Sequence, residues 1–159
     1  MSWTNADGLT VLMHGEQGEV KDNGSTTESM TQTLIVDIDD ATAVPSSAAT
    51  PAANDAFIPA GSYVKNAYLV IETAFTSAGA ATLTIGTYNA AGTAIDADGV
   101  DAAIALTAID AAGDVVVCDG AQVGGVVTVG SANAYVKVNY GTAAFTAGKA
   151  KLYVEYIPA

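Results

Sequence analysis

Few side chains in this 159-residue sequence could perform chemistry. The single histidine, His14, stands in the polar sequence Met-His-Gly-Glu, and a general base needs a pocket and a partner that orients it. We interpret His14 as a polar contact residue. The single cysteine, Cys118, follows Val115–Val117 and is predicted to be a small buried hydrophobe. One histidine and one cysteine cannot form the usual tetrahedral zinc site, so we expect no metal and no other cofactor.

The densest set of potential metal ligands is Asp96, Asp98 and Asp101, within the sequence Asp-Ala-Asp-Gly-Val-Asp. Aspartates at alternate positions followed by glycine are typical of the start of a calcium-binding loop. The glutamate that would complete such a loop is missing, and Asp101 has the wrong spacing for it. We therefore interpret this segment as a solvated acidic loop, with a structural calcium ion as the alternative.

The sequence motifs of common enzymes are missing as well. We find no Gly-x-Ser-x-Gly nucleophile elbow, no phosphate-binding Gly-Lys-Ser/Thr loop and no dinucleotide-binding glycine pattern after a strand. Glu72 and Glu155 lie in predicted strands and could pair as glycosidase carboxylates do, but neither stands beside a sugar-stacking tryptophan. The single tryptophan is Trp3, near the start of the chain. We expect that the protein is not an enzyme.

The charge of the chain narrows the range of partners. Five lysines and no arginine stand against 17 acidic residues, which gives a net charge of −12. Nucleic-acid binding needs a basic face, so we expect no nucleic-acid partner and no contact with an anionic membrane. No apolar run approaches the ~20 residues that span a bilayer. The start Met1–Asn5 lacks the features of a signal peptide, which predicts synthesis in the cytoplasm without secretion.

Alternation of apolar and polar residues, which is typical of β-strands, recurs along the chain. Strands are predicted over Thr33–Ile38, Tyr63–Thr73, Ala81–Tyr88, Gly113–Cys118, Gly125–Val129, Asn133–Tyr140 and Ala150–Ile157. The segment Asp96–Asp110 is ambiguous, with a helical turn over Val100–Ala105 or a strand over Ile104–Ile109. About eight strands, without a long amphipathic helix to connect parallel strands, predict an all-β antiparallel sandwich. A jelly roll is our first choice and an immunoglobulin-like sandwich the second.

Two stretches of the chain echo each other. Phe75–Ile85 and Phe145–Val154 both begin with Phe-Thr, continue through a short Ala/Gly turn, and end in a strand that carries a leucine and β-branched residues. We predict that Phe75 and Phe145 mark equivalent corners of the sandwich.

The first 30 residues differ in composition from the rest. They are polar, contain several glycines, and hold only one short apolar run, Leu9–Met13. Such a segment cannot bury enough surface by itself to offset its ordering entropy. We predict an extended N-terminal arm over residues 1–30, held on its own domain or on a neighbouring subunit, and a β-sandwich domain over residues 31–159. A long surface loop is expected over Asp39–Asp55.

The predicted strand Tyr63–Thr73 has apolar residues on both faces, which suggests that another chain or the arm covers it. In their predicted strands, three tyrosines lie on the face opposite the regular apolar residues: Tyr63, Tyr135 and Tyr153. They could serve as interface anchors, as platforms for sugar binding or as packing at the sheet edge. The candidate capsid- or subunit-binding residues lie in the arm and along this strand: Trp3, Leu9, Val11, Leu12, His14, Tyr63, Tyr68 and Val70.

Several segments of the chain resemble small structural proteins of tailed bacteriophages. The resemblance rests on Trp3–Val11, His14–Val20, Ile58–Gly61, Ala67–Phe75, Thr82–Gly86 and Asp101–Thr107. It is to capsid decoration or cement proteins, and it implies a jelly roll or a related fold. It also implies a structural virion protein on the outer capsid surface that binds the major capsid protein and cements neighbouring subunits.

We expect such a protein to associate with itself as a dimer or trimer. The acidic charge favours the outer surface, away from packaged DNA. The alternative is a receptor- or carbohydrate-binding module of a head fibre or tail, which outward tyrosines would suit.

Overall fold

The computed structural model of the chain describes residues 2–4, 10–12, 31–39, 46–52, 55–125 and 127–158. Residues 2–4 and 10–12 are described by their backbone alone and form an antiparallel hairpin of β1 (Ser2–Thr4) and β2 (Thr10–Leu12), in which Trp3 stands opposite Val11. The division of the chain into an arm and a sandwich at residue 30 stays a prediction.

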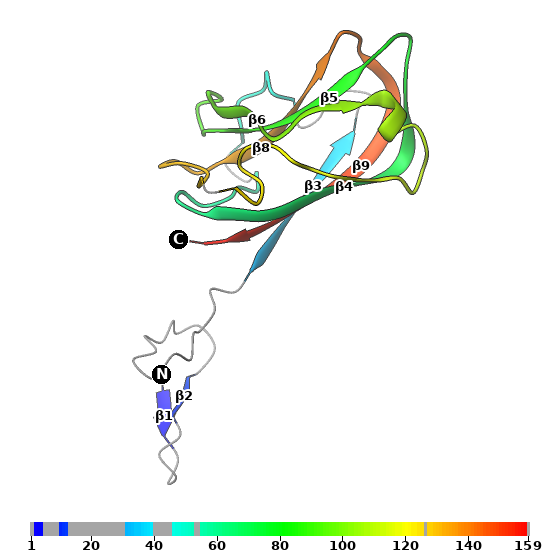
Figure 1. Ribbon diagram of the computed structural model, residues 1–159. Coiled ribbons are helices and arrows are strands. Elements are labelled where there is room, and N and C mark those ends of the chain that lie inside the picture. The colour runs from blue at the N-terminus through cyan, green and yellow to red at the C-terminus, as the bar shows by residue number, and fades with distance from the viewer. Residues whose placement is uncertain are drawn as a thin grey trace.

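The rest of the described chain forms two antiparallel sheets that pack face to face (Figure 1). The four-stranded sheet has the order β3-β9-β4-β7 and consists of β3 (Gln32–Asp39), β9 (Phe145–Ile157), β4 (Tyr63–Ser77) and β7 (Val115–Val117). The three-stranded sheet has the order β6-β5-β8 and consists of β6 (Ala94–Ala105), β5 (Thr82–Tyr88) and β8 (Tyr135–Gly141). The prediction of an antiparallel β-sandwich is confirmed.

The strand order matches that of a jelly roll at seven of its eight places. Numbered along the chain, one jelly-roll sheet runs first, eighth, third, sixth strand, and the other second, seventh, fourth, fifth. The four-stranded sheet matches the first order completely, and β8-β5-β6 matches the last three places of the second. Beside β8, where the second strand of a jelly roll would pair antiparallel, Ser46 forms only an isolated bridge with Val138, and this bridge is parallel. The Ser47 amide donates a hydrogen bond of 2.8 Å to the Val138 carbonyl.

The core lies between the two sheets and is built from alternate residues of each strand. On β9 and β4 the fully buried residues Leu152, Val154, Ala67 and Leu69 occupy successive inward positions, as the alternation predicts. Ile85 and Val138 face them from the three-stranded sheet. Phe75 and Phe145, the corner residues of the sequence echo, meet edge to face with ring centroids 5.2 Å apart.

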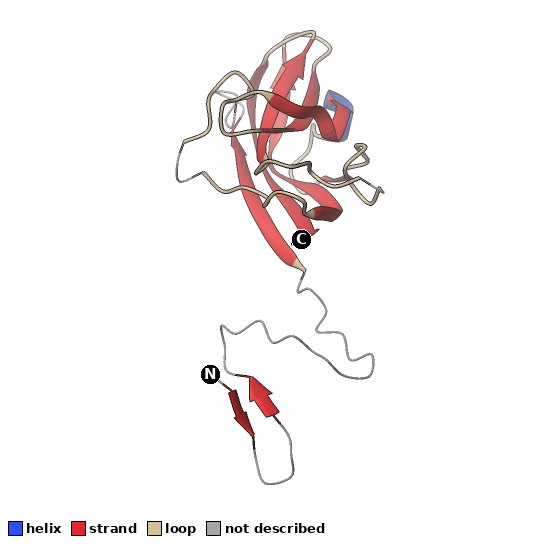
Figure 2. Cartoon of the chain, turned by 90° about the vertical axis from the view of Figure 1, so that its left-hand side faces the viewer, coloured by secondary structure: helices blue, strands red, loops and turns tan. Residues whose placement is uncertain are grey.

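Strand β6 corrects the expectation for residues 96–110. Neither a helical turn over Val100–Ala105 nor a strand over Ile104–Ile109 is present: β6 runs through to Ala105, and a short 3₁₀ turn, η2 (Leu106–Ala108), follows it (Figure 2). The pairing of β6 with β5 contains three register shifts, so inward and outward positions do not alternate evenly. For this reason the sequence of β6 lacks the alternation of apolar and polar residues that predicts a strand.

The expected strand over Gly125–Val129 is also wrong for the residues that are described there. Val129 is buried, and its amide donates to the Ser62 carbonyl, but residues 127–129 belong to no strand. Single backbone hydrogen bonds, and not a continuous strand pairing, hold this glycine-containing segment against the beginning of β4.

Residues 46–52 and 55–58 pack along β8. Ile58 forms an isolated bridge with Ala134, and the ring of Phe57 lies 5.5 Å from that of Tyr135. The ammonium group of Lys137, almost fully buried, lies 3.5 Å from the Asp55 carboxylate. Tyr135 is therefore covered rather than exposed on an outer face, because Phe57 packs on it.

Candidate functional site

Four side chains form a continuous row across the outer face of the four-stranded sheet. Ile35 on β3 stands opposite Tyr153 on β9, Tyr153 stands opposite Tyr68 on β4, and Tyr68 stands opposite Val117 on β7. Their neighbours along the strands point into the core, so all four point outward. Ile35 is 53% exposed and Val117 is 69% exposed, while the two tyrosines are half-buried. We call this set the apolar row.

The two tyrosines at the middle of the apolar row stack on each other. Their ring centroids are 5.1 Å apart and the ring planes differ by only 12°. This separation is close to the spacing of neighbouring strands, so the rings stand side by side on the sheet with their edges directed outward. One face of each ring is therefore covered by the other ring. This arrangement suits packing against a protein surface better than stacking on a sugar.

A second outward row flanks the apolar row on one side. It contains Asp37, Lys151, Val70 and Val115, the last 58% exposed. The Lys151 ammonium lies 2.9 Å from Asp37 and 3.1 Å from Glu72. Hydrogen bonds to Asp37 first and Glu72 second raise the pKa of Lys151. This lysine stays charged, and the carboxylates hold its position beside the tyrosines.

On the other side of the apolar row, Glu155 stands opposite Asn66 at a bulge in β4 that also contains Lys65. A further ion pair of 3.5 Å joins Lys149 and Asp39 at the far end of the sheet. The described charges of this sheet are the acidic residues Asp37, Asp39, Glu72 and Glu155 and the lysines Lys65, Lys149 and Lys151. Charge therefore nearly balances on this sheet, although the whole chain carries −12.

Three of the candidate binding residues lie on this face. Tyr68 is part of the apolar row and Val70 is part of the flanking row. Tyr63, the first residue of β4, is half-buried and stands opposite Ile157. The other candidates are separate from them in the chain. Trp3 and Val11 are cross-strand partners in the hairpin β1–β2, and Leu12 stands opposite Ser2; their side chains are not described. Leu9 and His14 lie outside the described residues.

Ile35, Val115 and Val117 belong to the site but were not among the predicted binding residues. Ile35 stands opposite the predicted row of Leu34, Val36 and Ile38. Val115 and Val117 belong to three successive valines, in which no alternation shows which face is buried. Only the register with β9 and β4 places them beside the tyrosines. Tyr153 was expected on an outward face, and it lies there.

The aspartates of β6 do not form the solvated loop that their spacing suggested. Asp101 is 6% exposed and lies within the strand, where burial raises its pKa. Burial, followed by a hydrogen bond with Asp98, raises the pKa of Asp96 as well. Among the described residues, no three His, Cys, Asp or Glu side chains are grouped so that they could hold a metal ion.

Cys118 is buried next to this acidic region. Burial, and then the negative charges of Asp101 and Asp119, raise its pKa to about 12. The thiol is therefore protonated at neutral pH and lacks the thiolate that nucleophilic cysteines use.

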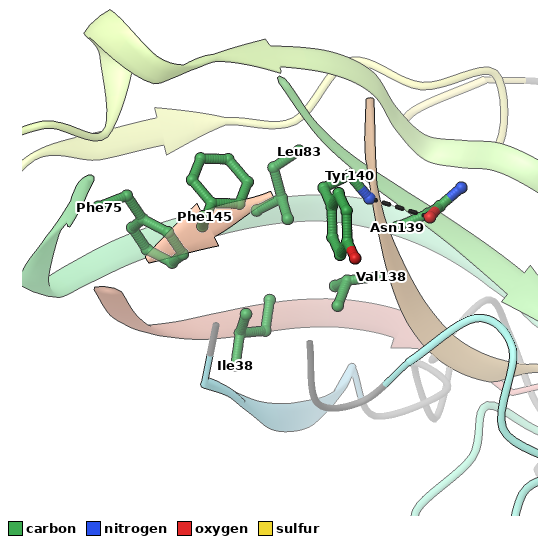
Figure 3. A pocket seen from close by; sticks show the side chains of 7 residues that line it. All are labelled: Ile38, Phe75, Leu83, Val138, Asn139, Tyr140 and Phe145. Carbon is green, nitrogen blue, oxygen red and sulfur yellow. Dashed lines mark hydrogen bonds between the residues drawn. The ribbon is translucent and has the colours of Figure 1, made fainter. Parts of the chain in front are cut away.

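A small cavity lies at the end of the sandwich where the corner phenylalanines meet (Figure 3). Its volume is about 10 Å³, and its lining is apolar apart from Asn139 and Tyr140: Ile38, Phe75, Leu83, Val138, Asn139, Tyr140 and Phe145. A cavity of this size holds at most about one water molecule. It cannot admit a substrate, and it marks a packing defect of the core.

The fold and the site define a jelly-roll sandwich that presents an apolar, nearly charge-balanced sheet face. None of the described helical segments is long and apolar enough to cross a bilayer. No protein-family model matches the chain, and no curated protein matches it in sequence.

Two solved structures share its fold. One is described as the capsid of Ralstonia phage GP4 and has a TM-score of 0.53 and 19% identity, covering 82% of this chain and 85% of that one. The other, the cyanophage Pam1 capsid asymmetric unit, has a TM-score of 0.52 and 19% identity, covering 92% of this chain and all of the other.

Proposed function

We propose that this chain is a structural virion protein that binds the outer surface of a phage capsid and cements neighbouring major capsid subunits. The observation that carries the proposal is the apolar row on an open sheet face of a fold found in two phage capsid structures. Large exposed apolar side chains that lie next to one another on a folded domain are typical of interaction sites.

Two parts of the chain divide the binding between them in this proposal. The arm, residues 1–30, reaches the capsid shell, and the sheet face provides a contact with a neighbouring subunit. The acidic charge supports a position outside the shell, because packaged DNA repels a chain of net charge −12. The same charge supports the absence of a nucleic-acid partner and of an anionic membrane partner.

The proposed role involves no catalysis. Among the described residues, the cysteine and the acidic side chains form no metal group. The Cys118 thiol is protonated, and the cavity at the end of the sandwich is too small for a substrate. A cement protein needs none of these features, since its work is done by binding alone.

The test is a co-sedimentation assay with shells assembled from the major capsid protein of the same virus. Full-length protein should bind in hundreds of copies per shell, whereas a fibre or tail component would bind in a few. Deletion of residues 1–25 should abolish binding while the circular dichroism spectrum keeps its β-sheet signal. If the deleted protein binds the shells as well as the full chain does, the role of the arm is wrong.

A further inference from the structure

We propose that the outer face of the four-stranded sheet binds a second copy of this chain, about a two-fold axis that runs along the apolar row. The proposal concerns the protein in solution and does not depend on shell binding. It names the neighbouring subunit that the sheet face contacts in the proposed function as a second copy of this chain, and it leaves the arm for the shell.

The distribution of charge selects this face for a contact between identical chains. Two copies with a charge of −12 repel each other wherever their acidic surfaces meet. Of the other described acidic residues, Asp96, Asp98 and Asp101 lie on β6 and Asp110 follows η2, whereas Asp114 and Asp119 flank β7 at one edge of the four-stranded sheet. Three of the four described lysines lie instead on β4 and β9. The part of the four-stranded sheet that β3, β9 and β4 form is therefore where two copies can approach with little repulsion.

The apolar row is also complementary to itself. Rotation by 180° about an axis along the row places each of its residues opposite the same residue of the partner. Aliphatic side chains then meet aliphatic ones at both ends, and the outward edges of Tyr68 and Tyr153 meet tyrosines at the centre. Tyrosine is enriched at protein interfaces, because its ring is large, rigid and amphipathic.

The same rotation pairs opposite charges. Lys151 and Glu155 lie on β9, two residues before and two residues after Tyr153, and both point outward. The rotation reverses the direction of the strand, so Lys151 of one copy meets Glu155 of the partner subunit. The symmetry forms this pair twice. A two-fold interface requires this reciprocal arrangement, in which the same patch serves both subunits.

The first test measures the dimer by sedimentation equilibrium over a range of protein concentrations. The full-length chain should be a monomer–dimer system with a dissociation constant on the order of micromolar, as is typical of weak, transient interfaces. Ile35→Lys and Val117→Lys should each weaken the dimer by about tenfold or more. Both residues are more than half exposed, so neither variant should unfold the sandwich, which a thermal melt verifies.

The matched control is Ala103→Lys, an exposed position on β6 in the other sheet. It adds the same positive charge to the acidic chain, so it separates a general reduction of repulsion from a loss of the interface. Its dimer should be as strong as the wild-type dimer or stronger. Equal weakening by all three lysine variants would contradict the proposal.

The second test exchanges the charges around Tyr153. Lys151→Glu and Glu155→Lys should each weaken the dimer, because each creates two like-charge contacts across the axis. The double variant should regain at least part of the lost affinity. Restoration would support the direction of the axis, and two independent losses that simply add would overturn it.

Three results would overturn the assignment of the face. The full-length chain could remain monomeric at every concentration, or its dimer could be unaffected by Ile35→Lys and Val117→Lys. Deletion of residues 1–25 could abolish the dimer, which would place the contact in the arm. Loss of shell binding in these lysine variants of a monomeric protein would instead assign the face to the shell protein, so the two proposals can fail separately.

Discussion

The ring of Phe75 lies edge to face against the ring of Phe145, with centroids 5.2 Å apart and planes at 74°. The two residues are 70 positions apart in the chain, and each begins one copy of the Phe-Thr echo. Phe75 lies near the end of β4, and Phe145 is the first residue of β9, which pairs with β4. The two similar stretches therefore begin at one shared corner of the sandwich, and they do not mark two separate corners.

Shortening the buried ring at this corner should cost stability. We expect Phe75→Leu to lower the free energy of unfolding by about 1–3 kcal/mol, because it changes the shape of a packed core and widens the adjacent cavity. Urea denaturation followed by circular dichroism measures the change. The control is Phe57→Leu, at a ring that is 38% exposed, where a smaller loss is expected. Equal losses of stability in the two variants would show that Phe75 contributes no more to stability than the partly exposed Phe57.

Gly148 is a second sensitive position, because it faces the same ring. A Cβ atom at this residue would lie 2.4 Å from two carbons of Phe75, and its φ of +148° is one that other residues rarely adopt. Gly148→Ala should therefore destabilise the protein by about 1–3 kcal/mol. Gly79→Ala is the control, since its Cβ would meet nothing closer than 3.6 Å. In the Phe75→Leu background the cost of Gly148→Ala should shrink, and purely additive losses would contradict the clash.

The buried thiol of Cys118 should make stability depend on pH in the alkaline range. Its folded pKa of about 12 lies above the ordinary value of 9.0. The contribution is fully present below pH 9 and is lost as pH rises toward about 12, because the unfolded thiol ionises first. We expect the difference in unfolding free energy between the wild type and Cys118→Val to be constant below pH 9. Above pH 9 the unfolding free energy of the wild type should fall relative to that of Cys118→Val.

Reactivity provides an independent measurement of the same thiol. A thiol reagent at pH 8 should label Cys118 only after denaturant is added, since burial hinders access and keeps the thiol protonated. Rapid labelling of the folded protein would show that the region around β7 opens easily.

The Lys137–Asp55 pair should hold residues 55–58 on β8. Lys137 is almost fully buried, and Asp55 is the one ion-pair partner that the described part of the chain offers it. Asp55→Asn should lower stability by about 1 kcal/mol, a value reduced because the carboxylate is partly exposed. It should also speed proteolysis between residues 46 and 58. Removal of both charges, in Asp55→Asn with Lys137→Met, should restore part of the loss, because no buried charge remains unpaired.

Much of the fold could be predicted from the sequence because a strand leaves a local signal. Alternation places Leu152, Val154 and Tyr156 on the inner face of β9, and they are buried there. Cys118, which the sequence predicts to be buried because it follows three valines, is buried as well. The jelly roll was the first choice on strand number, and the observed strand order agrees with it. Periodicity failed at β6, where register shifts break the alternation over Asp96 and Asp101.

The candidate site depended on the tertiary structure. The alternation in four separate segments indicates which residues share a face, but the apolar row exists only because Ile35, Tyr153, Tyr68 and Val117 fall in one register across β3, β9, β4 and β7. Residues 35 and 153 are distant in the chain, and no local rule sets their pairing. Likewise, Tyr135 and Tyr153 both alternate outward, yet Phe57 packs on the first, which is buried, and the second is only half-buried. The sequence thus determined the strands and their faces, and only long-range packing decided which outward faces stayed open.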